Sequence, residues 1–224
     1  QRLNDLQHVK VGTLRVGVAY SMSTVLTEGL ISFMKEFPGI KLEIIYKTVD
    51  ELLELLRERK VDFILSYKPL CDAPDIDSMP LFENSLALVV AKEHYLSGRK
   101  KIKLQELADK ELLLPSKGLQ ARTMLDKLME KKSFELSSSL ELNETNILLQ
   151  MVATGHYATI LSTSAVFGKP RFRAIPLDEP GNIMEASLLC LSGAYRKTAA
   201  KEFIKILLET DAVKRRLMNL TIEQ

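Results

Sequence analysis

The sequence predicts an α/β fold in two subdomains, and three observations support this prediction. The chain has 224 residues, of which 46% are apolar and 27% are charged, as in a globular protein with a sizeable core. From Thr13 onward, short apolar strands alternate with amphipathic helices, which is typical of doubly wound sheets. The alternation comes in two successive sets, and the last helices lie too far along the chain to belong only to the second set.

The first set is a strand–helix–strand–helix–strand unit. Its first strand carries Leu14, Val16 and Val18 at period two, as a buried strand should. The predicted elements are strand 13–19, helix 23–37, strand 41–46, helix 48–60 and strand 61–67. This order implies a parallel sheet with right-handed crossovers, and such sheets bind ligands beyond the carboxyl ends of their strands. The turns that fall at this edge are 20–24, 46–48 and 66–68.

The second set repeats the alternation and then leads into closing helices. The predicted elements are strand 85–91, helix 103–111, strand 112–115, helix 119–132, strand 137–142, helix 143–155, strands 157–162, 172–177 and 184–192, and helices 196–210 and 211–220. The strands that begin at 85 and 184 are long enough to cross between two subdomains. The segment 72–80 is rich in Asp and Pro and is expected to be a loop.

The charge balance and the cysteines exclude several classes of protein. There are 31 basic and 29 acidic residues, so we do not expect this chain by itself to bind nucleic acid. No apolar run approaches the ~20 residues that span a bilayer, and no leader is evident, which favours a cytoplasmic protein. Cys71 and Cys190 match no metal-ligand spacing, so no metal and no cofactor is expected.

The turn after the first strand raises a specific question. Ser21, Ser23 and Thr24 stand at the predicted start of a helix, yet the first carboxylate is Glu28. A helix start has unpaired N–H groups and a partial positive charge, which a carboxylate normally satisfies. Either the hydroxyls cap the helix, or the position is open to an external anion.

Other polar residues have structural interpretations beside functional ones. Thr48 and Glu51 have the spacing of a capping box, and Lys117 lies in a loop where a solvated lysine is usual. His156 follows the glycine that ends a helix, where it can meet the last carbonyls. The remaining expectations are His8 and His94 at the surface, Cys190 in the core, and Cys71 as a silent thiol or, alternatively, a redox-sensing one.

At this point the order of several stretches resembles a known family. These stretches are "GTLRVGV", "FPGIKLEI", "LLELLRERKVDFIL", "MPLFENSLALVVAKEHYLS", "LQELADKELLLP" and "LLQMVATGHYATILS". Their order and spacing are similar to those of the effector-binding domains of LysR-type transcriptional regulators, from about Gly12 to Glu209. The first stretch, "QRLNDLQHVK", is expected to be the tail of a linker helix that follows a missing DNA-binding domain.

The resemblance implies a type 2 periplasmic-binding-protein-like fold. Two doubly wound α/β subdomains would be joined by two crossover strands, with a cleft between them. The expected boundaries are 1–10 for the end of the linker helix, 11–88 with 191–224 for subdomain I, and 89–190 for subdomain II. The resemblance also implies a homodimer, a tetramer for the full-length protein, and DNA contact only through the missing N-terminal domain.

The resemblance places a small-molecule effector in the cleft. The residues that it assigns to the effector are Ser21, Met22, Thr48, Ser66, Tyr67, Pro115, Ser116, Lys117, Leu161 and Ser162. Neutral hydroxyls with one lysine favour a small anion or zwitterion. This sequence differs from the usual pattern of the family at two places in the expected effector site. Tyr67 stands where some relatives have an arginine, and "GHYATILS" replaces a common glycine- and proline-containing pattern.

Three functions compete on this evidence. The leading one is the ligand-sensing domain of a transcription factor, which modulates transcription by the full-length protein. The alternative is a solute-binding protein of a transporter with the same fold. An enzyme is the third, but the sequence shows no paired catalytic carboxylates, no nucleophile with a base and no phosphate-binding glycine loop.

Overall fold

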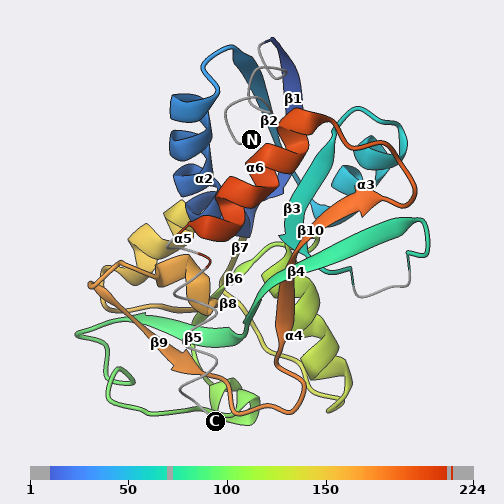
Figure 1. Ribbon diagram of the computed structural model, residues 1–224. Helices are drawn as coiled ribbons and strands as arrows, with labels where there is room; N and C mark the ends of the chain where they lie inside the picture. The colour runs from blue at the N-terminus through green and yellow to red at the C-terminus, as the bar shows by residue number, and fades with distance from the viewer. Residues whose placement is uncertain (1–10, 70–72, 211–212, 214–224) are drawn as a thin grey trace. The chain divides into compact units, whose positions relative to one another are not determined.

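The computed structural model describes residues 11–69, 73–210 and 213, and the chain divides into two compact units (Figure 1). Unit 1 contains the residues up to Glu83 and those from Glu185 onward, and unit 2 contains Asn84–Met184. The division falls at 83/84 and 184/185, several residues before the expected 88/89 and 190/191. The reason is strand pairing, because the strand after 84 joins the sheet of unit 2 and the strand after 184 joins the sheet of unit 1.

Unit 1 is built on a five-stranded mixed sheet. Its strands are β1 (Gly12–Ala19), β2 (Ile40–Lys47), β3 (Phe63–Tyr67), β4 (Ile76–Asn84) and β10 (Met184–Leu191), in the order β2-β1-β3-β10-β4. β1 pairs in parallel with both β2 and β3, which confirms the predicted β-α-β-α-β unit. β10 runs antiparallel to β3, so the sheet is mixed rather than purely parallel.

The loop predicted over 72–80 is wrong for most of its length, since β4 begins at Ile76. Its residues Asp77 and Pro80 favoured a loop because proline cannot donate to a strand ladder. β4 is the edge strand of the sheet, where a missing N–H is tolerated, and its buried side chains Leu81 and Phe82 supply the apolar contact.

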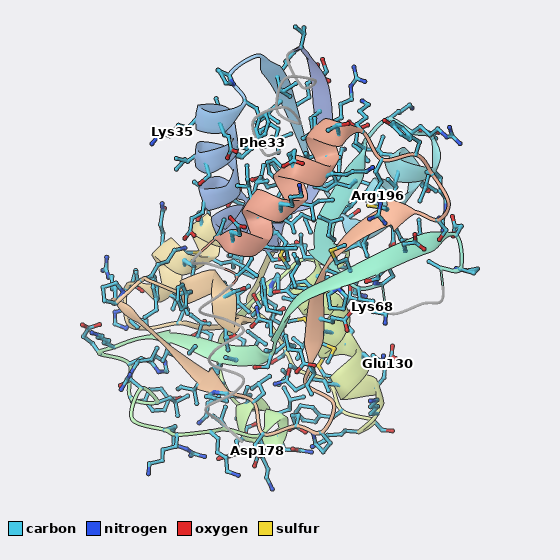
Figure 2. The ribbon with its side chains drawn as sticks, in the orientation of Figure 1. Phe33, Lys35, Lys68, Glu130, Asp178 and Arg196 are labelled. Carbon is cyan, nitrogen blue, oxygen red and sulfur yellow. The ribbon has the colours of Figure 1, made fainter. Side chains whose placement is uncertain are left out.

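Three helices within the described residues cover the sheet of unit 1. They are α2 (Ser23–Glu36), α3 (Val49–Arg57) and α6 (Thr198–Glu209). α2 is amphipathic: Phe33 faces α6, whereas Lys35 points away from it (Figure 2). The Phe33 ring lies 5.2 Å from the ring of Phe203 on α6, which in turn lies 5.6 Å from Phe63 on β3. These aromatic rings join the helices to the sheet.

The packing of α3 on β1 depends on Gly17. A Cβ atom at this position would lie 2.8 Å from Leu52 Cδ2 and 3.3 Å from Ile64 Cγ1, in a fully buried environment. Gly17→Val should therefore lower the free energy of unfolding by about 1–3 kcal/mol, because overpacking a close-packed core forces strain. Urea denaturation tests this, with Gly98→Val as the control, because no atom lies within 4 Å of a Cβ there. Equal losses for both variants would contradict the packing argument.

Unit 2 contains a second five-stranded mixed sheet. Its strands are β5 (Leu86–Ala91), β6 (Leu112–Pro115), β7 (Leu140–Leu142), β8 (Ala158–Ser162) and β9 (Phe172–Pro176), in the order β7-β6-β8-β5-β9. β6 pairs in parallel with β7 and β8, whereas β5 pairs antiparallel to β8 and β9. The helices are α4 (Gln120–Glu130) and α5 (Thr145–Val152), with 3₁₀ turns η3 (Leu104–Leu107) and η4 (Thr163–Val166).

Most predicted elements of the second set are present, but several are shorter. The helix predicted over 103–111 is only the four-residue η3, and the strand predicted over 137–142 is limited to β7. Met124 and Met129 on α4 are buried and belong to the core of unit 2. Four predictions fall outside the described residues: those for the helix 211–220, for Cys71, for His8 and for the linker-like stretch 1–10.

Candidate functional site

In unit 1, the carboxyl ends of β1, β2 and β3 meet at one edge of the sheet because these strands are parallel. Ser21 follows β1, Thr48 follows β2, and Ser66 with Tyr67 ends β3. The fold thus brings the predicted unit 1 residues to the same edge. Their environments differ: Met22, Ser66 and Tyr67 are fully buried, whereas Ser21 is partly exposed.

The start of α2 has neither an acidic residue in its first turn nor a side-chain cap from its N-cap residue, Met22. The Ser23 hydroxyl donates to the Tyr20 carbonyl at 2.8 Å, so it faces back along the chain. The Ser21 hydroxyl has no hydrogen-bond partner among the residues that the structure describes. The 3₁₀ turn η2 (Tyr20–Met22) leads directly into α2, and it also has neither an acidic residue in its first turn nor a side-chain cap. The helical start therefore carries a partial positive charge and the free Ser21 hydroxyl, which together are suited to an anion.

Thr48 has a structural role, and the predicted capping box at α3 is confirmed. Glu51 Oε2 accepts hydrogen bonds from the Thr48 hydroxyl at 2.7 Å and from the Thr48 backbone N–H at 3.0 Å. The Lys47 ammonium lies 3.0 Å from the other oxygen of the same carboxylate. The Thr48 hydroxyl is therefore engaged with the helix start.

These contacts lower the pKa of Glu51 to about 2, with the Thr48 hydroxyl as the largest cause, then its backbone N–H, then Lys47. Because the folded pKa lies below the ordinary 4.5, the stabilisation is complete above pH 4.5 and is lost as the pH falls to about 2. Glu51→Gln should therefore reduce the free energy of unfolding at neutral pH, and the difference from wild type should shrink over that interval. Urea unfolding at several pH values measures this, with the exposed Glu54→Gln on the same helix as the control. A difference that is independent of pH would contradict the capping argument.

A pair of tyrosines stands beside these residues and was not among the predicted site residues. Tyr20 and Tyr46 stack with their ring centroids 5.9 Å apart, and they are 44% and 37% exposed. Each closely precedes a predicted site residue, Ser21 or Thr48, and this position at two adjacent strand ends was the available sequence signal. Two partly exposed aromatic rings give this edge an apolar surface next to its polar groups.

Ser66 contributes a buried hydroxyl to the same edge. Its Oγ has no hydrogen-bond partner within the described part of the chain. Across the ladder, the facing Ser187 donates to its own strand neighbour Glu185 at 3.0 Å instead. An unsatisfied buried hydroxyl costs about 1–3 kcal/mol, and a polar ligand group or a water that reached it would recover that cost.

In unit 2, the turn that follows β6 is held by a buried arginine. Arg122 on α4 donates through Nη1 to the Pro115 carbonyl at 3.2 Å and pairs with Glu141 at 2.8 Å, while its Nε pairs with Asp126 at 2.7 Å. The Ser116 backbone N–H donates to Leu142 on the neighbouring strand. Pro115, Ser116 and Lys117 are thus fixed at the carboxyl end of β6.

Lys117 is exposed and forms no ion pair with any described residue. The Arg122 hydrogen bond is the main cause that lowers the pKa of the Glu141 carboxyl, and the charge of Lys117 adds to it. Glu141 therefore stays ionised beside Arg122, and Lys117 supplies a positive charge to this edge.

The other predicted residues of unit 2 are engaged in packing or in hydrogen bonds. Leu161 belongs to an apolar core cluster with Val89 and Leu149. The Ser162 hydroxyl lies 3.0 Å from that of Ser164, which accepts from the Asn84 side chain at 2.7 Å. This network holds the end of β8 against the start of β5, and it leaves Ser162 less available to a ligand than Ser116 or Lys117.

Two expectations about single residues can also be resolved. Cys190 is buried, as predicted. The prediction that His94 lies at the surface is wrong, because His94 is only 5% exposed and its ring packs against that of Tyr95 with the centroids 4.5 Å apart. The described residues contain no group of three or more His, Cys, Asp or Glu side chains that could hold a metal ion.

The family is decided by a match along nearly the whole chain. Residues 7–212 match the model of the LysR substrate binding domain. This chain belongs to that family. It is accordingly a ligand-sensing regulatory domain of the type found in LysR regulators. The alternative function, a solute-binding protein of a transporter, is not favoured.

Curated relatives of this LysR domain are transcriptional regulators rather than enzymes. The chain is 25% identical over 158 residues to the HTH-type transcriptional activator CmpR of Synechocystis sp. (strain ATCC 27184 / PCC 6803 / Kazusa), covering 70% of this chain and 52% of that protein. It is 27% identical over 195 residues to the uncharacterized HTH-type transcriptional regulator YybE of Bacillus subtilis (strain 168), covering 86% and 66%. The chain thus spans between half and two thirds of the length of these relatives.

Solved structures share the fold of this LysR domain. The Synechocystis PCC6803 CcmR regulatory domain in complex with 2-PG has a TM-score of 0.78 at 20% identity, covering 88% of this chain and 96% of that chain. The effector binding domain of QuiR in complex with shikimate has a TM-score of 0.75 at 21% identity, covering 92% and 99%. These likenesses confirm the predicted α/β architecture. In the described part of this LysR domain, no helix has the length and apolar character needed to cross a membrane.

Proposed function

We propose that this domain binds a small anionic or zwitterionic effector through the carboxyl edges of its two sheets, and that binding alters transcription by the full-length regulator. The observation that carries the proposal is the start of α2, which has no acidic residue in its first turn and has the free Ser21 hydroxyl beside it. An external anion would be attracted by the partial positive charge of this helical start. On the unit 2 side, Ser116 and the exposed Lys117 would complete the site, with its charge complementary to an anion.

The residues of the proposed site differ in what they offer. Ser21, Ser66, Ser116 and Lys117 present groups that are free for a ligand, whereas Thr48 and Ser162 support the local structure. Tyr20 and Tyr46 would contact an apolar part of the effector. Closure of the two units around the ligand would be a hinge motion, driven by the higher affinity of the closed state.

Solved relatives support a small ligand, since one is in complex with 2-PG and another with shikimate. The proposal extends to a regulator that works in the cytoplasm without catalysis and contacts DNA through a separate N-terminal domain. The near balance of 31 basic and 29 acidic residues supports the last point. This chain alone should therefore show neither tight DNA binding nor turnover of any ligand it binds.

A thermal-shift screen tests the proposed site. The chain is mixed with small carboxylates, amino acids and inorganic anions, alongside Ser21→Ala and the control Ser32→Ala, whose side chain is exposed on α2. A ligand at about 100 times its Kd should stabilise the fold by about 2.7 kcal/mol, which is roughly 2–4 °C for a chain of this size. Ser21→Ala should abolish the shift and Ser32→Ala should keep it. A shift that survives Ser21→Ala would remove Ser21 from the site.

We also propose that the domain forms a homodimer through α2, and a tetramer in the full-length protein. Ile31 and Met34 lie on α2 with 66% and 59% of their surfaces exposed, a location that favours an interface with a second molecule. The resemblance to LysR regulators predicts α4 as the partner helix. Ile31→Asp should convert the dimer to a monomer in light-scattering measurements. A dimer that persists in Ile31→Asp combined with Met34→Lys would place the interface elsewhere.

A further inference from the structure

Unit 2 has a pocket of about 200 Å³ at the edge of its sheet that is opposite to Pro115 and Ser162. Leu112 and Ala158, which line the pocket, are the first residues of β6 and β8, whereas Pro115 and Ser162 are the last residues of these strands. The pocket is therefore separate from the edge assigned above to the effector. All of its lining residues belong to unit 2.

The inner wall of the pocket contains a buried hydrogen-bond donor. His94 is one of the lining residues and is 5% exposed. Its Nδ1 accepts the Leu96 backbone N–H at 3.2 Å, so the proton of the neutral ring is on Nε2. Burial lowers the pKa of His94, which keeps the ring neutral. No described residue accepts a hydrogen bond from Nε2, so the donor is available to a ligand.

The rim of the pocket carries charges of both signs. Lys110 places its ammonium 5.7 Å from the centre of the Tyr95 ring, and Asp109 and Glu111 stand on either side of Lys110 in the sequence. None of these three charged groups forms an ion pair with a described residue. The apolar end of the pocket is defined by three buried lining residues, Leu107, Leu112 and Ala158.

We propose that this pocket binds a small zwitterion of the α-amino-acid type. The ligand carboxylate would accept from His94 Nε2–H and face the Lys110 ammonium, and the ligand ammonium would face Asp109 and Glu111. A short aliphatic side chain would fill the apolar end. A simple anion would be repelled by the two carboxylates, and a simple amine would leave the His94 donor unsatisfied. A ligand with both charges and a small apolar group therefore fits this lining, which also includes the exposed His156.

NMR titration of the ¹⁵N-labelled chain tests this inference with three probes: L-valine, isovalerate, which is valine without its ammonium group, and isobutylamine, which is valine without its carboxylate. L-valine should cause saturable shifts of the amides of Leu96, Leu107 and Ala158. Isovalerate and isobutylamine should bind at least about tenfold more weakly, because each loses one charge-assisted contact. Equal affinity for the three probes, or no saturable shift at these amides, would overturn the proposal.

Two variants and two controls connect the shifts to the pocket. His94→Phe keeps the ring and its stacking on Tyr95 but removes Nε2–H, and it should abolish L-valine binding. Glu111→Gln changes an exposed side chain and should weaken L-valine about tenfold while strengthening isovalerate, because one repelling carboxylate is removed, so it remains informative if His94→Phe fails to fold. Glu93→Gln and Ser21→Ala should bind as wild type does. Loss of the L-valine-induced amide shifts in Ser21→Ala would also overturn the proposal, as would their retention in both His94→Phe and Glu111→Gln. These outcomes do not depend on whether the effector site proposed above is correct.

Discussion

Replacing Arg122 with methionine is expected to lower the free energy of unfolding by about 2 kcal/mol, because a buried hydrogen-bonded charge is lost from a network. Arg122 joins α4 to the Pro115 carbonyl at 3.2 Å and to Glu141 on β7 at 2.8 Å. The full cost of breaking a buried ion pair does not apply, since the side chains of Asp126 and Glu141 are 32% and 42% exposed and can be solvated. Urea denaturation measures the loss.

The same substitution should reduce effector affinity, since it frees the turn that carries Ser116 and Lys117. We expect a loss of about tenfold, comparable to one displaced charge-assisted contact. Arg122→Lys keeps the charge but cannot make the planar fork, so it should recover stability only in part. Arg99→Met is the matched control, because Arg99 forms an exposed ion pair with Glu106 and should cost less than about 1 kcal/mol. Similar losses for Arg99→Met and Arg122→Met would refute a special role for Arg122.

The second large effect is expected at Asn182, a buried residue just before the chain leaves unit 2. Its side chain accepts the Leu86 N–H at 2.8 Å and donates to the carbonyls of Leu86 at 2.9 Å and Leu177 at 3.2 Å. Asn182 thus anchors the first residue of β5, which also pairs with Ser162 on β8. Asn182→Ala should cost about 3 kcal/mol, because it leaves the buried Leu86 N–H unpaired and removes one of the two donors from each of the Leu86 and Leu177 carbonyls.

Thermal unfolding and urea denaturation of Asn182→Ala measure this loss, with the exposed Asn143→Ala as the control. Asn182→Asp keeps an acceptor for the Leu86 N–H but removes both donors, so it should also destabilise the fold. If Asn182→Ala were as stable as Asn143→Ala, the anchoring role of the side chain would be refuted.

Local patterns predicted much of the fold. The period-two apolar residues of β1 and the strand–helix alternation were sufficient to predict the parallel sheet of β1, β2 and β3, because alternate side chains of a strand point to the same face and the helices cross over between parallel strands. The capping box of Thr48 and Glu51 was also predictable from a local pattern, since its two residues are only three positions apart. β4 was missed because its edge position, which tolerates Pro80, depends on distant strands.

The features of the candidate site also divide into those that local sequence patterns predicted and those that they did not. The open start of α2 was visible in the sequence as an absence of acidic residues between Ser21 and Glu28. The Tyr20–Tyr46 stack was not visible in the sequence, because it depends on the register in which β1 pairs with β2. Arg122 was missed because two of its partners, Pro115 and Glu141, lie outside its own helix. The burial of His94 was missed because its local sequence contains no pattern that indicates it. Contacts between residues far apart in sequence have no local pattern to reveal them.

The most direct test of the proposed effector site is hydrogen–deuterium exchange of the chain with and without a ligand found in the thermal-shift screen. The account predicts slower exchange in both 20–24 and 115–118, because one ligand would contact both sheet edges. Slower exchange in neither segment, or only around the pocket at 94–96 and 107–112, would contradict it.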